Sequence, residues 1–358
     1  MSKTPLPETL EKPDTFFSAK LPLEQLSGKV VSRLSPESVI FVPTKPNPIV
    51  VLGETLFDFY FDSIKEFTPG QRHVVLHGAP GGAPANVAAN LASMGKPVSL
   101  ISSFSDDVLG ATLKDMLRER NIDLNLSSTH PQTRTAVAMV MNSAEGERSF
   151  SLYLQGSSLE RIDRGSVNLT DDVDFFHFGS VLFVFEAGVN VTRQLLEQLQ
   201  DQKTVRSCDI NIRPDILRGN PEANKDIMDV LTKVDVLKLS DEDLTWIRDN
   251  IDASLASPRD YFRFGVKLLV YTEGPKGASL LTPAEECFVP APQVEVVDTT
   301  GGGDAFVAGV LASLYDAGFT NRDDLPHLDQ ATLLRIGQRA SECSKQILSQ
   351  AGAMPPVK

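Results

Sequence analysis

The sequence has few cysteines and no long apolar run. Its three cysteines, Cys208, Cys287 and Cys343, are widely spaced and form no C-x-x-C pair. That pattern argues against a disulfide framework or a zinc site, and we expect reduced thiols in a cytoplasmic protein. No stretch approaches about 18 uninterrupted apolar residues, and no basic region followed by an apolar run opens the chain. We therefore expect neither a membrane span nor a secretory leader.

Positive charge is also scarce. The chain has 34 lysines and arginines against 47 aspartates and glutamates, and its formal net charge is −13. Such a surface repels phosphate backbones and anionic lipids, so nucleic acid and membranes are not expected as partners. A local basic groove of a few residues can still attract a small anion. Hydrophobic residues make up 41% of the 358 residues, enough for the core of one large α/β unit with an accessory element.

Residues 1–47 differ from the rest of the chain. Prolines punctuate short apolar pieces there, and no helical period is sustained. We expect an N-terminal extension, and the sequence leaves open whether it is disordered, packs on the main body or contacts a partner. Residues 48–358 are expected to form the main domain.

Strand and helix signals alternate along this domain. The expected strands are 49–52, 98–102, 205–212, 234–239 and 267–272, and the expected helices are 84–94, 107–120, 189–199, 304–315 and 333–348. This alternation predicts an α/β fold with a doubly wound, mainly parallel sheet covered by helices. Two regions, about 56–77 and 133–154, instead carry strand-like runs, the second with the turn Ser143–Gly146. We expect them to form a small accessory sheet over one edge of the main sheet.

A glycine-rich turn, Asp298-Thr-Thr-Gly-Gly-Gly-Asp304, follows the strand-like segment Val294–Val297 and precedes a strong helix signal. Its glycines let the backbone approach a ligand and leave N–H groups pointing outward, which together with the helix dipole suits a transferring phosphoryl group. A carboxylate at the position of Asp304 can take a proton from a hydroxyl beside it. An ordinary helix cap has the same pattern, and the turn alone does not decide between the two.

A second glycine-rich junction places Asn86 early in a helix, shortly after Gly81 and Gly82. The amide side chain both donates and accepts hydrogen bonds, which suits a sugar hydroxyl, although an asparagine near a helix start is common without any ligand. Neither junction is a P-loop, because the chain lacks G-x-x-x-x-G-K-[ST] and no G-x-G-x-x-G opens a helix after a strand.

Taken in this order at the two ends of one α/β domain, the two junctions resemble the motifs of the ribokinase-like (PfkB) family of carbohydrate kinases, and within it the fructokinase-like branch. The resemblance extends from about Ile49 to Pro355. It implies an ATP-dependent sugar kinase with a ribokinase-like fold whose small sheet acts as a lid. Asp304 would be the catalytic base, and the backbone at Gly301, Gly302 and Gly303 would stabilise the developing charge.

The resemblance also implies which residues face the sugar. Gly53-Glu-Thr-Leu-Phe-Asp58 matches the family's first strand motif, so Asp58 would bind sugar hydroxyls together with Gly81, Gly82 and Asn86. The segment Ser105-Asp-Asp107-Val-Leu-Gly110 is similar to a G-x-D-x-x-G motif with serine in its first place, and Asp107 would line the sugar pocket. Asp209-Ile-Asn211-Ile-Arg213 resembles D-x-N-x-R, which would place Asn211 and Arg213 on the phosphate path.

Nucleotide and metal contacts are implied in the same way. Thr272-Glu-Gly274-Pro-Lys-Gly277 resembles a T-x-G-x-x-G nucleotide motif, and Lys238-Leu-Ser240-Asp-Glu-Asp243 takes the place of N-x-x-E, which organises magnesium through water. The implied nucleotide residues are Lys238, Ser240, Thr272, Gly274, Gly277 and Ser341, the last in place of an asparagine near adenine. Asp243 or Glu242 would serve Mg²⁺. A monovalent cation such as K⁺ near the Asp298 loop and a homodimer formed through the lids are further implications.

The acceptor sugar is less well defined. The branch favours fructose, phosphorylated on a primary hydroxyl, but two positions depart from its pattern. Gly302 replaces the alanine of the usual Gly-Ala-Gly-Asp loop, which keeps every N–H group of the loop. Tyr153-Leu154 replaces a Tyr-Arg pair in the lid, so the arginine that would reach the sugar is missing, and this departure makes fructose less secure. Two alternatives stay open. One is a kinase of another sugar or nucleoside, such as ribose or 2-keto-3-deoxygluconate, and the other is a kinase-derived binding or assembly protein without turnover.

Overall fold

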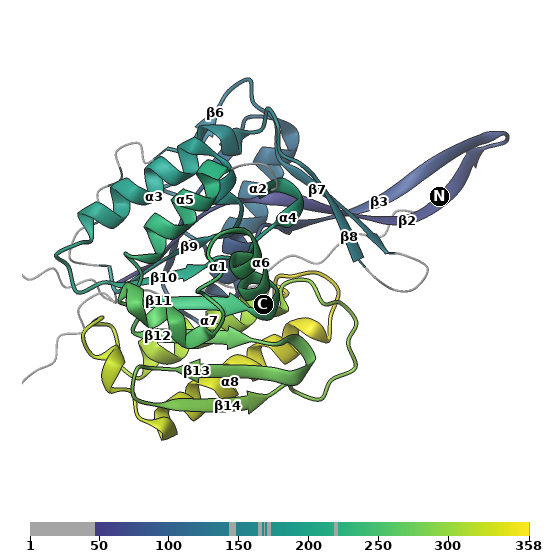
Figure 1. The fold of residues 1–358 in the computed structure, drawn as a ribbon. Helices are drawn as coiled ribbons and strands as arrows, with labels where there is room; N and C mark the ends of the chain where they lie inside the picture. Colours follow the sequence, from purple (N-terminus) through teal and green to yellow (C-terminus); the bar gives the residue numbers. More distant parts are fainter. Residues whose placement is uncertain are drawn as a thin grey trace, which may run out of the picture. The chain divides into compact units, whose positions relative to one another are not determined.

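An eight-stranded sheet forms the centre of the fold (Figure 1). The computed structural model describes residues 47–142, 148–163, 167, 169, 173–217 and 221–357. The strand order is β14-β13-β12-β11-β10-β9-β1-β4. The strands are β1 (Ile49–Leu52), β4 (Val98–Ile101), β9 (Phe175–Gly179), β10 (Val205–Asp209), β11 (Val236–Ser240), β12 (Leu268–Thr272), β13 (Gly277–Leu281) and β14 (Glu286–Pro290). The first six run parallel and the last two pair antiparallel at one edge, which confirms the predicted doubly wound α/β class.

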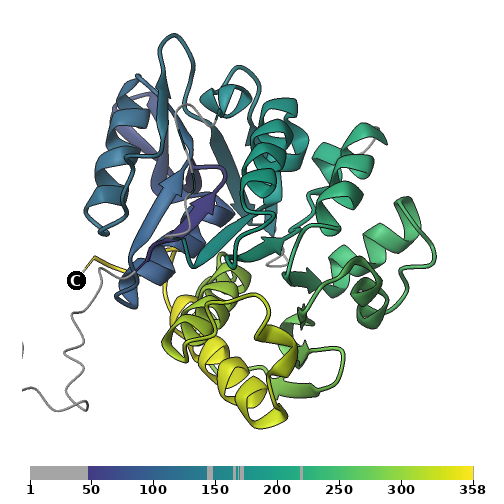
Figure 2. The same cartoon turned by 90° about the vertical axis from the view of Figure 1, so that its left-hand side faces the viewer.

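Helices cover both faces of this sheet. In β1, Ile49 and Val51 pack into one core while Val50 and Leu52 pack into the other, as expected for an apolar run in a strand buried on both sides. The first core includes α1 (Ala83–Ser93), α2 (Val108–Arg118), α7 (Gly302–Asp316) and α8 (Gln330–Leu348). The second includes α3 (Glu186–Gln198), α5 (Pro221–Leu231) and α6 (Asp241–Asn250). Helices α7 and α8 lie side by side in both views (Figures 1 and 2).

A separate sheet with the strand order β3-β2-β7-β8 lies at one end of the main sheet (Figure 1). Its strands are β2 (Leu56–Thr68), β3 (Gln71–Gly81), β7 (Val137–Asn142) and β8 (Arg148–Tyr153). The small accessory sheet predicted from these two regions is therefore confirmed. The turn predicted at Ser143–Gly146 lies outside the described residues, and β7 and β8 pair antiparallel on either side of it.

Shorter elements complete the described chain. Strand β5 (Ser103–Ser105) pairs with β6 (Ser128–His130), and α4 spans Pro214–Leu217. Turns of 3₁₀-helix cover Ser158–Arg161, Ser180–Val184, Pro258–Phe264, Gly274–Lys276 and Leu325–His327. Among the helices of the described residues, none combines the length and the apolar character that a membrane span requires.

Two strand predictions near the site are wrong in detail. Residues Val294–Val297 form no strand. The segment runs past the end of α8 instead, where the Val297 N–H donates to the Leu348 carbonyl at 2.8 Å. Strand β10 ends at Asp209 rather than at Ile212, because Asn211 has a φ of 45° and turns the chain out of the sheet.

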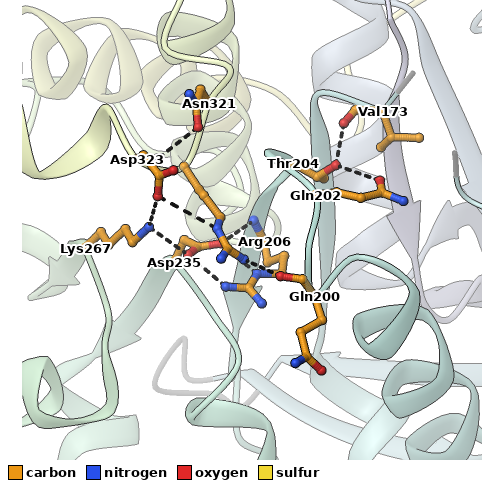
Figure 3. A network of polar contacts seen from close by, with 10 residues as sticks. Val173, Gln200, Gln202, Thr204, Arg206, Asp235, Lys267, Asn321 and Asp323 are labelled. Atoms are coloured by element: carbon orange, nitrogen blue, oxygen red, sulfur yellow. Dashed lines mark hydrogen bonds and ion pairs between the residues drawn. The ribbon is translucent and has the colours of Figure 1, made fainter. Parts of the chain in front are cut away.

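A buried polar network ties the amino ends of β10, β11 and β12 together (Figure 3). Arg206 binds Asp235 through two nitrogens, at 2.8 and 3.0 Å, and the Asp235 side chain is 1% exposed. Lys267 lies 3.6 Å from the same carboxylate and 3.0 Å from Asp323. Because these contacts lie at the amino ends of parallel strands, they support the sheet at the edge opposite to the glycine-rich junctions.

Candidate active site

The two glycine-rich junctions meet at the carboxyl edge of the main sheet. Strand β1 pairs with both β4 and β9, so the chain reverses its winding direction there, and open α/β sheets bind ligands at such a point. The Asn86 Nδ2 donates a 2.8 Å hydrogen bond to Asp304 Oδ2, although the residues are 218 positions apart. In the described part of the chain, Asn86 Oδ1 is buried and accepts no hydrogen bond. Asn86 Oδ1 is therefore an acceptor that the described residues leave unused.

Asp304 lies in the first turn of α7 and is 7% exposed. Burial raises the pKa of its carboxyl group. The hydrogen bond from Asn86 and the charges of Lys238 and Arg213 act in the opposite direction and favour the carboxylate. A buried carboxylate with these neighbours, at a helix start, is suited to accepting a proton.

The glycine turn before Asp304 combines a tight backbone with an open face. Gly301 has a φ of 79°, and a Cβ atom on it would lie 2.5 Å from the Ala353 Cβ, so only glycine fits. At Gly303 a Cβ atom would meet only the Lys238 Nζ, at 3.8 Å. The backbone at Gly303 therefore faces space that a ligand can fill.

Asp58 approaches from β2 and lies against the end of β3. A Cβ atom on Gly81 would lie 2.1 Å from Asp58 Oδ2, so this contact requires glycine. Burial, with the charges of Asp304 and Asp298, raises the pKa of Asp58 to about 7, and Arg213 opposes the shift. The predicted sugar-side residue therefore shares one electrostatic environment with the predicted base.

Glu54 is a buried carboxyl group to which the sequence interpretation gave no role. Its Oε1 accepts a hydrogen bond from the Ala83 N–H at 3.1 Å, at the start of α1 just after Gly82. Burial raises the pKa of Glu54 to about 7. Glu54 lies inside the motif used for Asp58, but nothing in the local pattern indicated that its side chain turns inward to hold α1.

Asp107 caps α2 and connects it to the segment before β7. Its Oδ1 accepts hydrogen bonds from the Gly110 N–H and the Thr135 hydroxyl, and its Oδ2 accepts from the Thr135 N–H. Burial opposes ionisation, but these hydrogen bonds outweigh it and lower the pKa of Asp107 to about 2. The structure thus shows a capping role, and sugar contact by Asp107 stays a prediction.

Polar residues follow β10 and β11 on the same edge. Asp209 and Lys238 are register partners on these strands and form a buried ion pair of 3.0 Å. Asp243 accepts hydrogen bonds from the Ser240 N–H and hydroxyl and from the Ile212 N–H, so both of its oxygens order the backbone. Arg213 donates to Asn211 Oδ1 at 2.5 Å.

A cavity of about 730 Å³ opens beside the glycine turn. Among the residues assigned to the nucleotide, those that line it are Thr272, Gly274, Gly277 and Ser341, together with Gly302 and Gly303 of the turn. Lys238 and Ser240 are not in this lining. One wall consists of 289–294 and Val296, which the sequence interpretation did not include because part of it was assigned to a strand. The volume is within the range of small-molecule and cofactor pockets.

Metal ligands are sparse in this region. Among the described residues, no three histidine, cysteine, aspartate or glutamate side chains form a group that could hold a metal ion. Mg²⁺ usually keeps several waters and binds through one or two carboxylates plus substrate phosphates. At the end of β11, the exposed Glu242 is therefore suited to a metal that arrives on a triphosphate, whereas Asp243 is buried and both of its oxygens bind the backbone.

A buried carboxylate at a glycine-rich helix start, beside a nucleotide-sized cavity at the carboxyl edge of a parallel sheet, is an arrangement suited to a small-molecule kinase. Residues 47–358 match the pfkB family carbohydrate kinase, and the chain belongs to this family. It is a carbohydrate kinase, a transferase that uses ATP and has an alcohol group as acceptor.

Known relatives agree with this assignment. The chain is 30% identical over 311 residues to the probable fructokinase-3 of Arabidopsis thaliana, which covers 86% of this chain and 88% of that protein. The crystal structure of fructokinase with bound ATP from Xylella fastidiosa has a TM-score of 0.75 and 25% identity, covering 86% of this chain and 95% of that one. A fructokinase from Vibrio cholerae O395, in fructose, ADP and calcium ion bound form, has a TM-score of 0.69 and 26% identity, covering 86% and 94%.

Proposed function

We propose that the acceptor is fructose and that Asp304 takes the proton from its primary hydroxyl. The observation that carries this proposal is the Asn86–Asp304 hydrogen bond, which sets a buried carboxylate beside the open face of the glycine turn. The Vibrio cholerae fructokinase, which shares this fold, binds fructose and ADP, and this supports the choice of sugar.

In the proposed reaction, the sugar lies between Asp58, Asn86 and Asp304. A sugar hydroxyl donates to Asn86 Oδ1, and the primary hydroxyl gives its proton to Asp304. The resulting alkoxide attacks the γ-phosphate in line, the bond to ADP breaks, and the proton stays on Asp304. Backbone N–H groups at Gly302 and Gly303, with the amino end of α7, stabilise the charge on the transferred group.

ATP occupies the 730 Å³ cavity in this proposal, with Thr272, Gly274, Gly277 and Ser341 around it. Arg213 and Lys238 face the phosphates, with Ser240 at the end of β11, and Asp107 closes the sugar side. Mg²⁺ bound to the triphosphate would be oriented by Glu242 or Asp243, and it supplies charge neutralisation there. A monovalent cation is proposed near Asp298, whose carboxylate accepts from the Thr300 and Gly352 N–H groups.

The small sheet is proposed to act as a lid and as a dimer contact. Phe61 and Leu76 face each other on β2 and β3, as do Ile64 and Val74, and all four are exposed. An exposed apolar stripe of this kind favours a protein partner, and we propose a second copy of this chain. Light scattering of Ile64→Asp should then give a monomer where the unchanged chain gives a dimer.

A kinase of another sugar or nucleoside is the second candidate. Leu154, which stands where fructokinase lids carry arginine, is 7% exposed and packs with Leu56 and Ala138 under the small sheet. Its apolar side chain supplies no cation for the sugar.

Residues 1–47 are proposed to be an extension outside the kinase domain. The protein is proposed to be cytoplasmic, and the free cysteines are compatible with this.

The test is sugar-dependent ADP release with a panel of acceptors. We expect fructose to rank first and Asp304→Asn to lose about 100-fold or more of the turnover while still binding ATP. If ribose, a nucleoside or 2-keto-3-deoxygluconate ranked far above fructose, the acceptor would be wrong and the kinase right. If no sugar stimulated ADP release, a non-catalytic binding or assembly role would be favoured instead.

A further inference from the structure

Two buried ion pairs join the same strands at opposite ends. Asp209 on β10 pairs with Lys238 on β11 at the carboxyl end, at 3.0 Å. Arg206 on β10 pairs with Asp235, the residue just before β11, at the amino end, at 2.8 Å (Figure 3). The second pair lies at the edge of the sheet opposite to the glycine turn, so it serves as a comparison for what such a pair does for the sheet. The first pair lies beside the glycine turn.

Lys238 has more than one anionic neighbour. Its Nζ lies 3.8 Å from the position of a Cβ on Gly303, one residue before Asp304. The charged groups that act on Lys238 are Asp209 from β10, Asp243 from α6 and Asp304 from α7, with the buried His177 on β9 nearby. Its ion pair in the described chain is with Asp209.

We propose that Asp209 is a positioning residue, which holds the Lys238 ammonium at the glycine turn and keeps it from pairing fully with Asp304. This inference rests on the proposed role of Asp304 as the base. Held in this way, Lys238 favours the ionised form of Asp304 and faces the phosphoryl group, while Asp304 keeps enough proton affinity to take a proton. Without Asp209, Lys238 would neutralise the base.

The two partners of the pair therefore act on Asp304 in opposite directions. Lys238→Met removes a cation, so the pKa of Asp304 should rise. Asp209→Asn releases Lys238 to Asp304 and removes a nearby negative charge, so the pKa of Asp304 should fall. A neighbouring charge in a buried site shifts a pKa by about one unit or more. Asn86 on α1, Arg213 after β10 and Asp58 on β2 face the same carboxyl group and are unchanged in both variants.

The pKa of Asp304 can be measured without turnover. We suggest ¹³C NMR titration of carboxyl-labelled aspartate in the full chain, with the Asp304 resonance assigned by its loss in Asp304→Asn. The acid limb of the kcat profile with ATP and the best acceptor sugar is the second readout. The matched controls are Asp235→Asn and Lys267→Met at the amino ends of the strands. Lys267→Met is the smaller perturbation, because Asp235 keeps Arg206 as its partner.

Opposite shifts of at least about one unit for Lys238→Met and Asp209→Asn, with no shift in the controls, would support the proposal. Shifts in the same direction, or none, would overturn it, even if both variants lose stability as the controls do. If Asp209→Asn does not fold, two other results test the proposal. The pKa of Asp304 should rise in Lys238→Met, and in the double variant it should lie between the values of Lys238→Met and of the unchanged chain. If no sugar supported turnover, the proposed function would be contradicted. The NMR titration would then still test the positioning role of Asp209.

Discussion

The Asn86 side-chain amide donates a 2.8 Å hydrogen bond to Asp304 Oδ2 and so joins the starts of α1 and α7. A glycine is the N-cap residue of each helix, Gly82 for α1 and Gly301 for α7. The amide therefore does two things at once. It stabilises the carboxylate against burial, and it leaves its own Oδ1 for a ligand.

Loss of this hydrogen bond should make Asp304 harder to ionise. A hydrogen bond to a charged group contributes about 1.5–3 kcal/mol, and one pKa unit corresponds to about 1.4 kcal/mol. In Asn86→Ala we therefore expect the acid limb of kcat/KM to move up by about one pH unit. Asn90→Ala, one turn further along α1, is the control, because the Asn90 side-chain amide donates to the Asn86 carbonyl of the same helix. An unchanged limb in Asn86→Ala would show that the amide does not act on the base.

Two glycines of the turn should respond differently to alanine. Gly301→Ala places a side chain at a φ of 79° against Ala353, so we expect a loss of stability of about 1–2 kcal/mol or more. Gly303→Ala meets no protein atom closer than 3.8 Å, so its stability should be kept. Its added methyl group lies where the phosphates are proposed to bind, and ATP affinity should fall about tenfold or more. Denaturant unfolding and nucleotide titration of both variants test this, and normal ATP binding by Gly303→Ala would contradict the placement of the nucleotide.

Stability should fall with rising pH because of Asp58. Its pKa is raised to about 7 in the folded chain, against an ordinary value of 3.8, so the folded state binds more protons between these values. The contribution of this group to stability is fully present below about pH 4 and is lost as the pH rises through about 7. Asp58→Asn removes the loss, on the order of 1 kcal/mol for every unit of raised pKa. The difference between variant and unchanged chain, measured by urea unfolding, should therefore grow from pH 5 to pH 8. The same experiment on the exposed strand neighbour Asp62→Asn should show no such growth.

The amino-end network should matter for folding and not for chemistry. Asp235→Asn leaves Arg206 and Lys267 without their buried anion, and breaking a buried ion pair costs about 3–5 kcal/mol. Asp323→Asn alters an exposed partner of the same lysine, so solvent screening should make its effect on stability small. Activity per folded molecule should be unchanged in both. If folded Asp235→Asn lost most of its kcat, the amino-end network would be shown to affect catalysis at the active site.

Local patterns were enough for much of the fold. The apolar run Ile49–Leu52 and the alternation after it predicted a parallel sheet, because strand burial and helix period are properties of neighbouring residues. The same kind of reasoning failed for Val294–Val297. There an apolar, β-favouring segment passes the end of α8 and becomes a cavity wall, because its backbone is bound by α8 and not by a strand.

Local sequence patterns were sufficient for the fold class, the two glycine-rich junctions and, through their resemblance to a family, the residues worth testing. How those residues act on one another depends on the three-dimensional arrangement of the chain. Asn86 meets Asp304, Asp209 meets Lys238, and Glu54 turns inward to α1, through contacts between segments that are distant in the chain. The proton affinity of these carboxyl groups depends on burial and on charges brought together by strand order, and no local pattern contains either.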